Sequence, residues 1–114
     1  MQVIEDLDVF KISYNLVLKI YKATRNFPKE ELYGLSSQMR RAAVSITSNL
    51  SEGGARTSDA EKRHFISIAR GSSAELKCQI SIAKDLGFIE IDTANDLMDD
   101  IVRVKKMLTG LLRN

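Results

Sequence analysis

The stretch Ser58–Gly87, SDAEKRHFISIARGSSAELKCQISIAKDLG, contains both ends of one long helix. It opens on the capping-box pattern S-x-x-E, in which Ser58 and Glu61 satisfy free backbone N–H groups of the first turn. It closes at Gly87, because glycine adopts at low cost the left-handed conformation that ends helices. The pattern predicts a helix from Ser58 to Leu86, about 42 Å long at 1.5 Å per residue. Its expected core stripe repeats every seven residues and consists of Phe65, Ala69, Ser72, Leu76, Gln79, Ala83 and Leu86.

Three further segments have helical periodicity, and the spacing predicts helices over residues 8–25, 35–52 and 93–112. The expected stripes are Phe10, Ser13, Val17, Ile20 and Thr24; then Leu35, Met39, Ala42, Ile46 and Asn49; then Ala94, Leu97, Ile101, Val104, Leu108 and Leu111. Four amphipathic helices joined by short connections predict an all-α, antiparallel up-down-up-down four-helix bundle. We expect it to occupy residues 1–114 as one domain.

Side chains near the ends of these helices predict where each one starts and stops. A carboxylate at Asp6 or Asp8 can cap the first helix, because it accepts hydrogen bonds from free N–H groups. Asp92 or Thr93 is expected to cap the last helix in the same way. The pair Gly53-Gly54 is expected to terminate the second helix.

Apolar residues exceed what one bundle core needs, above all on the first and third helices. The third helix carries a second row of Ile66, Ser73 and Ile80 beside its core stripe, and Ile68 and Ile82 lie on another side. Scattered apolar residues are normal on a protein surface. A contiguous apolar face indicates contact with another chain. We therefore expect a homo-oligomer, for which a closed ring with a head-to-tail interface and a twofold-symmetric dimer are the two alternatives.

The composition offers little catalytic chemistry. The single cysteine, Cys78, excludes an intrachain disulfide and is expected to act as a small buried apolar residue. The single histidine, His64, is expected to face solvent or to form a local hydrogen bond. Neither glycine-rich phosphate-binding pattern is present. We expect no enzyme activity, no cofactor and no metal, and a cytoplasmic protein without a membrane partner, because no apolar run approaches about 20 residues.

Charge is unevenly distributed along the chain, although the formal net charge is only +2. Residues 36–84 carry a net charge of +4 and residues 85–100 a net charge of −6, while the last 14 residues contain four bases and no acid. Four bases of the long helix lie seven residues apart and form one stripe, which consists of Arg63, Arg70, Lys77 and Lys84. The last three have no acid three or four residues away. They are solvated, paired across helices or subunits, or bound to an anion, and the stripe is the candidate site for nucleic-acid phosphates.

A second group of polar residues lies on the helix predicted at residues 35–52. A polar group buried without a partner costs about 1–3 kcal/mol, so Asn49, on the core stripe, needs hydrogen bonds. We expect Asn49 and Glu52 to bind loop N–H groups, or Arg40 or Arg41 of an adjacent chain. Such a buried Asn fixes the register of an oligomer, which we prefer to a catalytic role.

The segment Gln38–Gly53, QMRRAAVSITSNLSEG, resembles the signature Q-x-R-R-A-x-x-S-I-x-x-N-[IL]-x-E-G of a bacterial family. These are the four-helix-bundle proteins encoded by intervening sequences in 23S rRNA genes. The same resemblance includes Phe27-Pro28, ELYGL at 31–35, IARGS at 68–72 with Glu75, and LGFI at 86–89. The accessory variability proteins of diversity-generating retroelements are similar in fold.

The resemblance implies an antiparallel four-helix bundle that assembles as a ring of five and has no known enzyme activity. From the retroelement relatives it implies binding of RNA or DNA, and of a reverse transcriptase, through a basic surface. Two functions are therefore hypotheses at this point. One is an accessory module that binds nucleic acid through the stripe, and the other is a structural scaffold that binds a protein partner without contacting nucleic acid.

Overall fold

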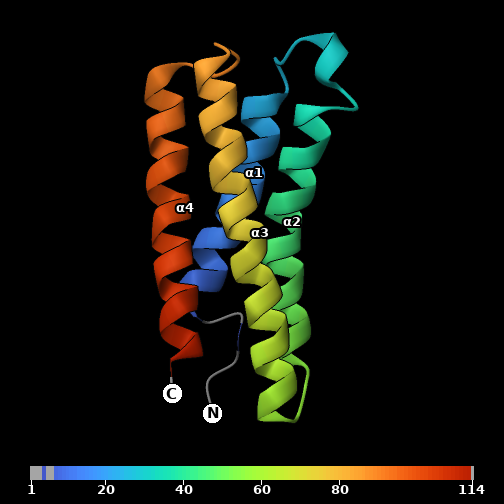
Figure 1. Cartoon of the computed structure of the whole chain (residues 1–114), viewed down its shortest axis with the longest axis vertical. Helices are drawn as coiled ribbons and strands as arrows, with labels where there is room; N and C mark the ends of the chain where they lie inside the picture. Colours follow the sequence, from blue (N-terminus) through green and yellow to red (C-terminus); the bar gives the residue numbers. More distant parts are fainter. Residues whose placement is uncertain (1–3, 5–6, 114) are drawn as a thin grey trace.

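The computed structural model describes Ile4 and residues 7–113, and within them the chain forms four α-helices and one short 3-10 helix (Figure 1). The elements are α1 (Asp8–Thr24), η2 (Lys29–Glu31), α2 (Leu35–Gly54), α3 (Asp59–Asp85) and α4 (Ile91–Leu112). Successive helices run antiparallel in a bundle of about 43 × 24 × 19 Å. The helices α1 and α3 each pack on α2 and α4 but not on one another, so they occupy opposite corners. The predicted all-helical fold is confirmed.

Both ends of α3 have the local chemistry that the sequence predicts. The Ser58 hydroxyl accepts a hydrogen bond from the Glu61 N–H at 3.1 Å and donates one to the Glu61 carboxylate at 3.2 Å. At the other end Gly87 has φ +76°, which allows the Phe88 N–H to donate to the Ala83 carbonyl at 2.9 Å. This bond reaches back across the left-handed residue and satisfies a terminal carbonyl.

We expect Gly87→Ala to lower the free energy of unfolding by about 1 kcal/mol, because a Cβ is strained in the left-handed region. Gly110→Ala is the matched control, since Gly110 is helical and an added Cβ there meets nothing within 4 Å. The control should be neutral or stabilising by up to about 1 kcal/mol. Urea denaturation followed by circular dichroism measures both, and equal effects from the two substitutions would contradict this role of Gly87.

The starts of α1 and α4 differ from the sequence expectation. Leu7 occupies the N-cap position of α1 and Asp8 is already helical, while Asp6 lies outside the described residues. The helix α4 starts at Ile91, so Asp92 lies in its first turn, where a carboxylate interacts favourably with the helix dipole. Its N-cap is Glu90, without a side-chain hydrogen bond. The predicted side-chain caps of α1 and α4 are therefore wrong for Asp8, Asp92 and Thr93.

The glycine pair at the end of α2 serves packing rather than termination. Both residues are helical, and Gly87 is the glycine with positive φ in the described part of the chain. A Cβ on Gly53 would lie 3.2 Å from the Phe65 Cβ of α3, and one on Gly54 would lie 2.8 Å from the Ile4 Cβ. The prediction that the pair ends α2 is wrong, because both positions are needed for close approach of other segments.

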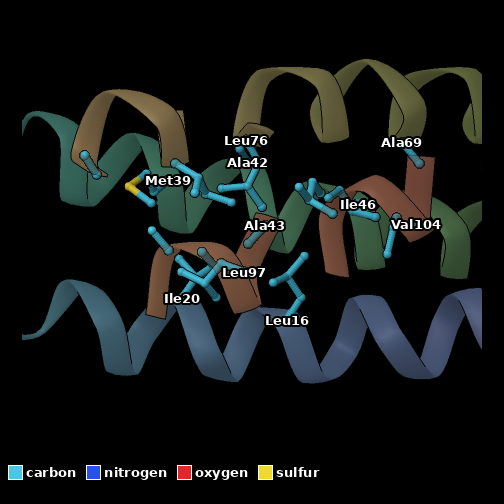
Figure 2. Close-up of a cluster of buried hydrophobic side chains, with 14 of the residues drawn as sticks. Leu16, Ile20, Met39, Ala42, Ala43, Ile46, Ala69, Leu76, Leu97 and Val104 are labelled. Carbon is cyan, nitrogen blue, oxygen red and sulfur yellow. The ribbon is translucent and has the colours of Figure 1, made fainter. Parts of the chain in front are cut away.

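The core lies along the bundle axis, with side chains from all four helices pointing inward (Figure 2). The buried set in α4 is Ala94, Leu97, Ile101, Val104 and Leu108, as predicted apart from the exposed Leu111. In α1 the buried set is Val9, Ser13, Leu16, Ile20 and Thr24, so Val9 and Leu16 replace the predicted Phe10 and Val17. In α2, Ser36 and Leu50 are buried in place of the predicted Leu35 and Asn49.

The second row of α3, which the sequence placed outside the bundle core, belongs to the core of the same chain. Ser73 and Ile80 are completely buried and Ile66 packs against the core, whereas the predicted Leu86 is exposed. A helix that packs on two neighbours buries a wider arc than one heptad stripe. On this helix the expected surplus therefore shrinks to Ile68 and Ile82, which remain exposed.

Candidate functional site

The basic stripe of α3 faces α4. Near its start, the Arg63 guanidinium donates a hydrogen bond to the Leu112 carbonyl at the end of α4. Near its middle, Lys77 lines a groove of about 500 Å³ with residues of α4, among them the bases Lys105, Lys106 and Arg113. Because seven residues return a helix to nearly the same side, Arg70 and Lys84 lie along the same line. We call this surface the basic seam, which consists of Arg63, Arg70, Lys77, Lys84, Lys105, Lys106 and Arg113.

Two acidic side chains of α4 lie on its side toward α1. The Lys19 ammonium of α1 is 2.7 Å from the Asp100 carboxylate and 3.0 Å from Asp96. The hydrogen bond to Asp100, and then that to Asp96, raises the pKa of Lys19 above its ordinary value. Within residues 7–113, no acid lies within 4 Å of any base of the basic seam. Asp96 and Asp100 thus pair with α1, while the bases of the basic seam have no ion pair in this part of the chain.

The four predicted phosphate-binding residues are not equivalent. Arg63 is half-buried and satisfies a terminal carbonyl of α4, which fixes the end of that helix. Arg70 is half-buried, while Lys77 and Lys84 are exposed. The role of all four in nucleic-acid binding stays a prediction.

Sequence reasoning missed the contribution of α4 to this surface. The excess of bases in the last 14 residues is visible in the sequence, and spacing of three and four residues joins Lys106, Thr109 and Arg113 on one helix face. Only the packing of α4 on α3 brings that face beside Lys77.

A polar groove of about 530 Å³ lies between α2 and α3 and contains Arg41, one of the predicted oligomer residues. We call it the α2–α3 groove; its lining is Gln38, Arg41, Ala42, Ser45, Ser72 and Glu75. The hydroxyl oxygens of Ser45 and Ser72 are 2.8 Å apart, which links the two helices. The Asn49 amide donates to the Ser45 carbonyl at 2.8 Å and to its hydroxyl at 3.0 Å. Asn49 is half-buried and finds its partner one turn earlier within α2 rather than in a loop N–H group, and a contact with an arginine of an adjacent chain stays a prediction.

The adjacent residues Arg40 and Arg41 serve opposite sides of α2. The Arg40 Nε donates to the Thr24 hydroxyl at 2.8 Å, and its guanidinium lies 4.8 Å from the centre of the Tyr21 ring. Arg40 therefore joins α2 to α1 within one chain. Glu52 forms an ion pair with Arg56, one turn later. Arg41 alone of these predicted residues is exposed beside a groove without an ion pair in the described structure.

The model of the 23S rRNA-intervening sequence protein family matches residues 5–110 of the chain. The chain belongs to this family. A 1.70 Å crystal structure from Bacteroides thetaiotaomicron, described as a protein with unknown function from the S23 ribosomal protein family, has the same fold. Its TM-score to this chain is 0.84 at 20% sequence identity, over 93% of this chain and 99% of that chain. None of the curated proteins matches.

In this member of the 23S rRNA-intervening sequence protein family, the other residues with reactive or metal-binding side chains are dispersed. His64 is exposed as expected, with its ring edge-on to Phe65. Cys78 is exposed, so its predicted role as a small buried residue is wrong; it lies on the outer side of α3. No three His, Cys, Asp or Glu side chains are grouped for metal binding among the residues described. None of the described helices is long and apolar enough to cross a membrane.

Proposed function

We propose that this protein is a non-enzymatic homo-oligomer, a ring of five copies, that binds nucleic-acid phosphates through its basic seam. The observation that carries the proposal is the gathering of Lys77, Lys105, Lys106 and Arg113 around one groove that contains no acid. Bases that neutralise phosphates release condensed counterions, and this release supplies most of the free energy of sequence-independent binding. A cytoplasmic location, and a protein partner such as a reverse transcriptase, stay predictions.

The length of the basic seam suits an extended polyanion. From Arg63 to Lys84 the stripe covers 21 residues of helix, about 32 Å at 1.5 Å per residue. No aromatic side chain lines the groove around Lys77, so base stacking, the usual means of holding single strands, is missing there. The arrangement supports contact with the backbone of a duplex, and such contacts carry no sequence information.

Assembly strengthens this surface. A ring repeats the basic seam once per subunit, so that several weak phosphate contacts act together on one long nucleic acid. The ring itself is supported by the apolar excess of α1 and by the family resemblance.

Fluorescence anisotropy with a labelled duplex RNA of mixed sequence, titrated at several salt concentrations, tests nucleic-acid binding. We expect tighter binding of the duplex than of either strand alone, and a log–log salt slope of about −0.9 for each phosphate contacted. Light scattering of the free protein tests the oligomer. Absence of duplex binding at about 50 mM salt, where electrostatic binding is strong, would overturn the nucleic-acid proposal.

A scaffold function is the second candidate, and one observation favours it. The segment after η2 exposes Leu32 and Tyr33 at one end of the bundle, with Tyr33 92% exposed. A tyrosine that presents a large contact area to solvent is typical of protein interfaces. The scaffold is supported if the assembled protein binds neither duplex nor single-stranded nucleic acid in the same titration.

A further inference from the structure

The helices at opposite corners of the bundle each expose an apolar face. On α1 the exposed face contains Tyr14, Leu18 and Tyr21, which lie at spacings of four and three residues; Leu18 is 57% exposed. On α3 it contains Ile68 and Ile82, with Ile82 44% exposed. We call these the α1 face and the α3 face. Because α1 and α3 occupy opposite corners of the bundle and both faces are exposed, the two faces lie on different sides of the molecule.

The α1 face is bordered by bases, and the α3 face carries an acid without an ion pair among the described residues. The exposed charged residues around the α1 face are the bases Lys11, Lys22 and Arg25. The α3 face carries the exposed acid Glu75, midway between its two isoleucines. None of these four groups has an ion pair within the described residues. Glu75 of one copy can therefore pair with a base of the α1 face of another copy, while Arg41 lies beside Glu75 on the same side of the molecule.

The α2–α3 groove adjoins the α3 face, since Glu75 belongs to both. Its wall of amide, hydroxyl and guanidinium groups can hold a side chain that is apolar along its length and polar at its tip. Tyrosine has this character and requires a hydrogen-bond partner when buried. Arg41 is positioned to stack on such a ring, as Arg40 already does on Tyr21 within the chain.

We propose that the α1 face of one copy packs against the α3 face of the next copy, with a tyrosine of α1 entering the α2–α3 groove. This rests on the homo-oligomer of the proposed function and assigns its contact surfaces. The contact joins two different surfaces, so it is heterologous and repeats from copy to copy.

The direction of the two faces determines how the copies are arranged. Tyr21 lies against Arg40 of α2, and Glu75 lines a groove together with α2, so both faces lean toward the same helix. Successive copies are therefore rotated in a constant sense, which bends the assembly toward closure with α2 on its inner side. The basic seam between α3 and α4 then lies on the outer side, accessible to nucleic acid.

Two variants block the two faces separately, and a mixture of them tests the assignment. Leu18→Glu removes the α1 face and leaves the α3 face intact, while Ile82→Glu does the reverse. Each variant alone should have the mass of a monomer, 12.8 kDa, in light scattering. An equimolar mixture should contain a heterodimer of twice that mass, because one intact pair of faces remains. Ile91→Glu, at an isoleucine 68% exposed on α4, which contributes to neither face, is the matched control and should keep the wild-type mass.

The possible outcomes separate this inference from the proposed function. A monomeric wild-type protein would contradict the homo-oligomer itself. An oligomeric wild type whose Leu18→Glu and Ile82→Glu variants keep the same mass, or whose mixture stays monomeric, would overturn the assignment of the faces alone. Circular dichroism shows whether each variant is folded. A folded Leu18→Glu monomer should still bind duplex RNA, with lower apparent affinity, because its basic seam is unchanged.

Discussion

Replacing Arg70 and Lys77 together with alanine will reduce the salt dependence of duplex RNA binding. Each phosphate contact contributes about 0.7–0.9 to the slope of log affinity against log salt, so the slope should fall by about 1.4–1.8. The same counterion release corresponds to a loss of affinity of about 10- to 100-fold at about 50 mM salt. Because the two side chains form no ion pair in the described part of the chain, their removal should leave the fold and the oligomer mass intact.

A charge-matched control distinguishes the basic seam from net charge. Lys29→Ala with Arg103→Ala removes the same two charges from exposed positions on η2 and α4 that do not line the groove around Lys77. Its slope and affinity should stay close to wild type. An equal loss in both double variants would contradict a localised site. If Arg70→Ala with Lys77→Ala instead dissociates the oligomer, the stripe belongs to an interface and the scaffold function is favoured.

Features of the fold that depend on a few neighbouring residues could be predicted from the sequence. The Ser58 cap and the Gly87 terminus of α3 follow from local hydrogen bonding and from backbone sterics. The stripe of α4 was also correct except at its last position, because that helix has a single well-separated apolar arc. The family resemblance, with its specific motif on α2, agrees with the matched family.

Features that depend on which helices are neighbours could not be predicted in the same way. A Gly-Gly pair such as Gly53-Gly54 is typical of a helix end, yet Gly53 lies within α2. Glycine is needed there because Phe65 of α3 approaches it closely. Asn49 occurs at a stripe position, but rotation of α2 buries Leu50 and leaves the amide half-exposed at the α3 boundary. If the buried side of a helix shifts by one residue, different side chains become buried, although the spacing of apolar residues in the sequence is the same.

The candidate site shows the same division. Spacing of seven residues was enough to align the bases of α3 on one line. It could not show that the line faces α4, where Lys105, Lys106 and Arg113 extend the positive surface. Nor could it show that Arg63 binds the Leu112 carbonyl, or that Arg40 and Arg41 point to different helices. These relations arise from packing between segments distant in the sequence.

Two isoleucines of α3, Ile80 and Ile82, test which side of this helix is buried. The sequence spacing placed both of them outside the core stripe. Ile80 is completely buried, so Ile80→Ala should lower the free energy of unfolding by about 2–5 kcal/mol through lost burial and the cavity left behind. That is a large part of the stability of about 5–15 kcal/mol that a domain of this size has. Ile82→Ala, at an exposed position, should change it by no more than about 0.5 kcal/mol.

Both substitutions are best measured by urea denaturation in the Leu18→Glu background, so that assembly does not contribute to the stability of either variant. A small effect at Ile80 would mean that the side chain is not in the core and that the surplus apolar row faces another copy. A large effect at Ile80 with a small one at Ile82 would mean that α3 buries one side in its own chain and offers the other to a neighbour. Two residues apart in sequence, the isoleucines then serve the fold and the assembly separately, because Ile80 is buried in its own chain and Ile82 is exposed.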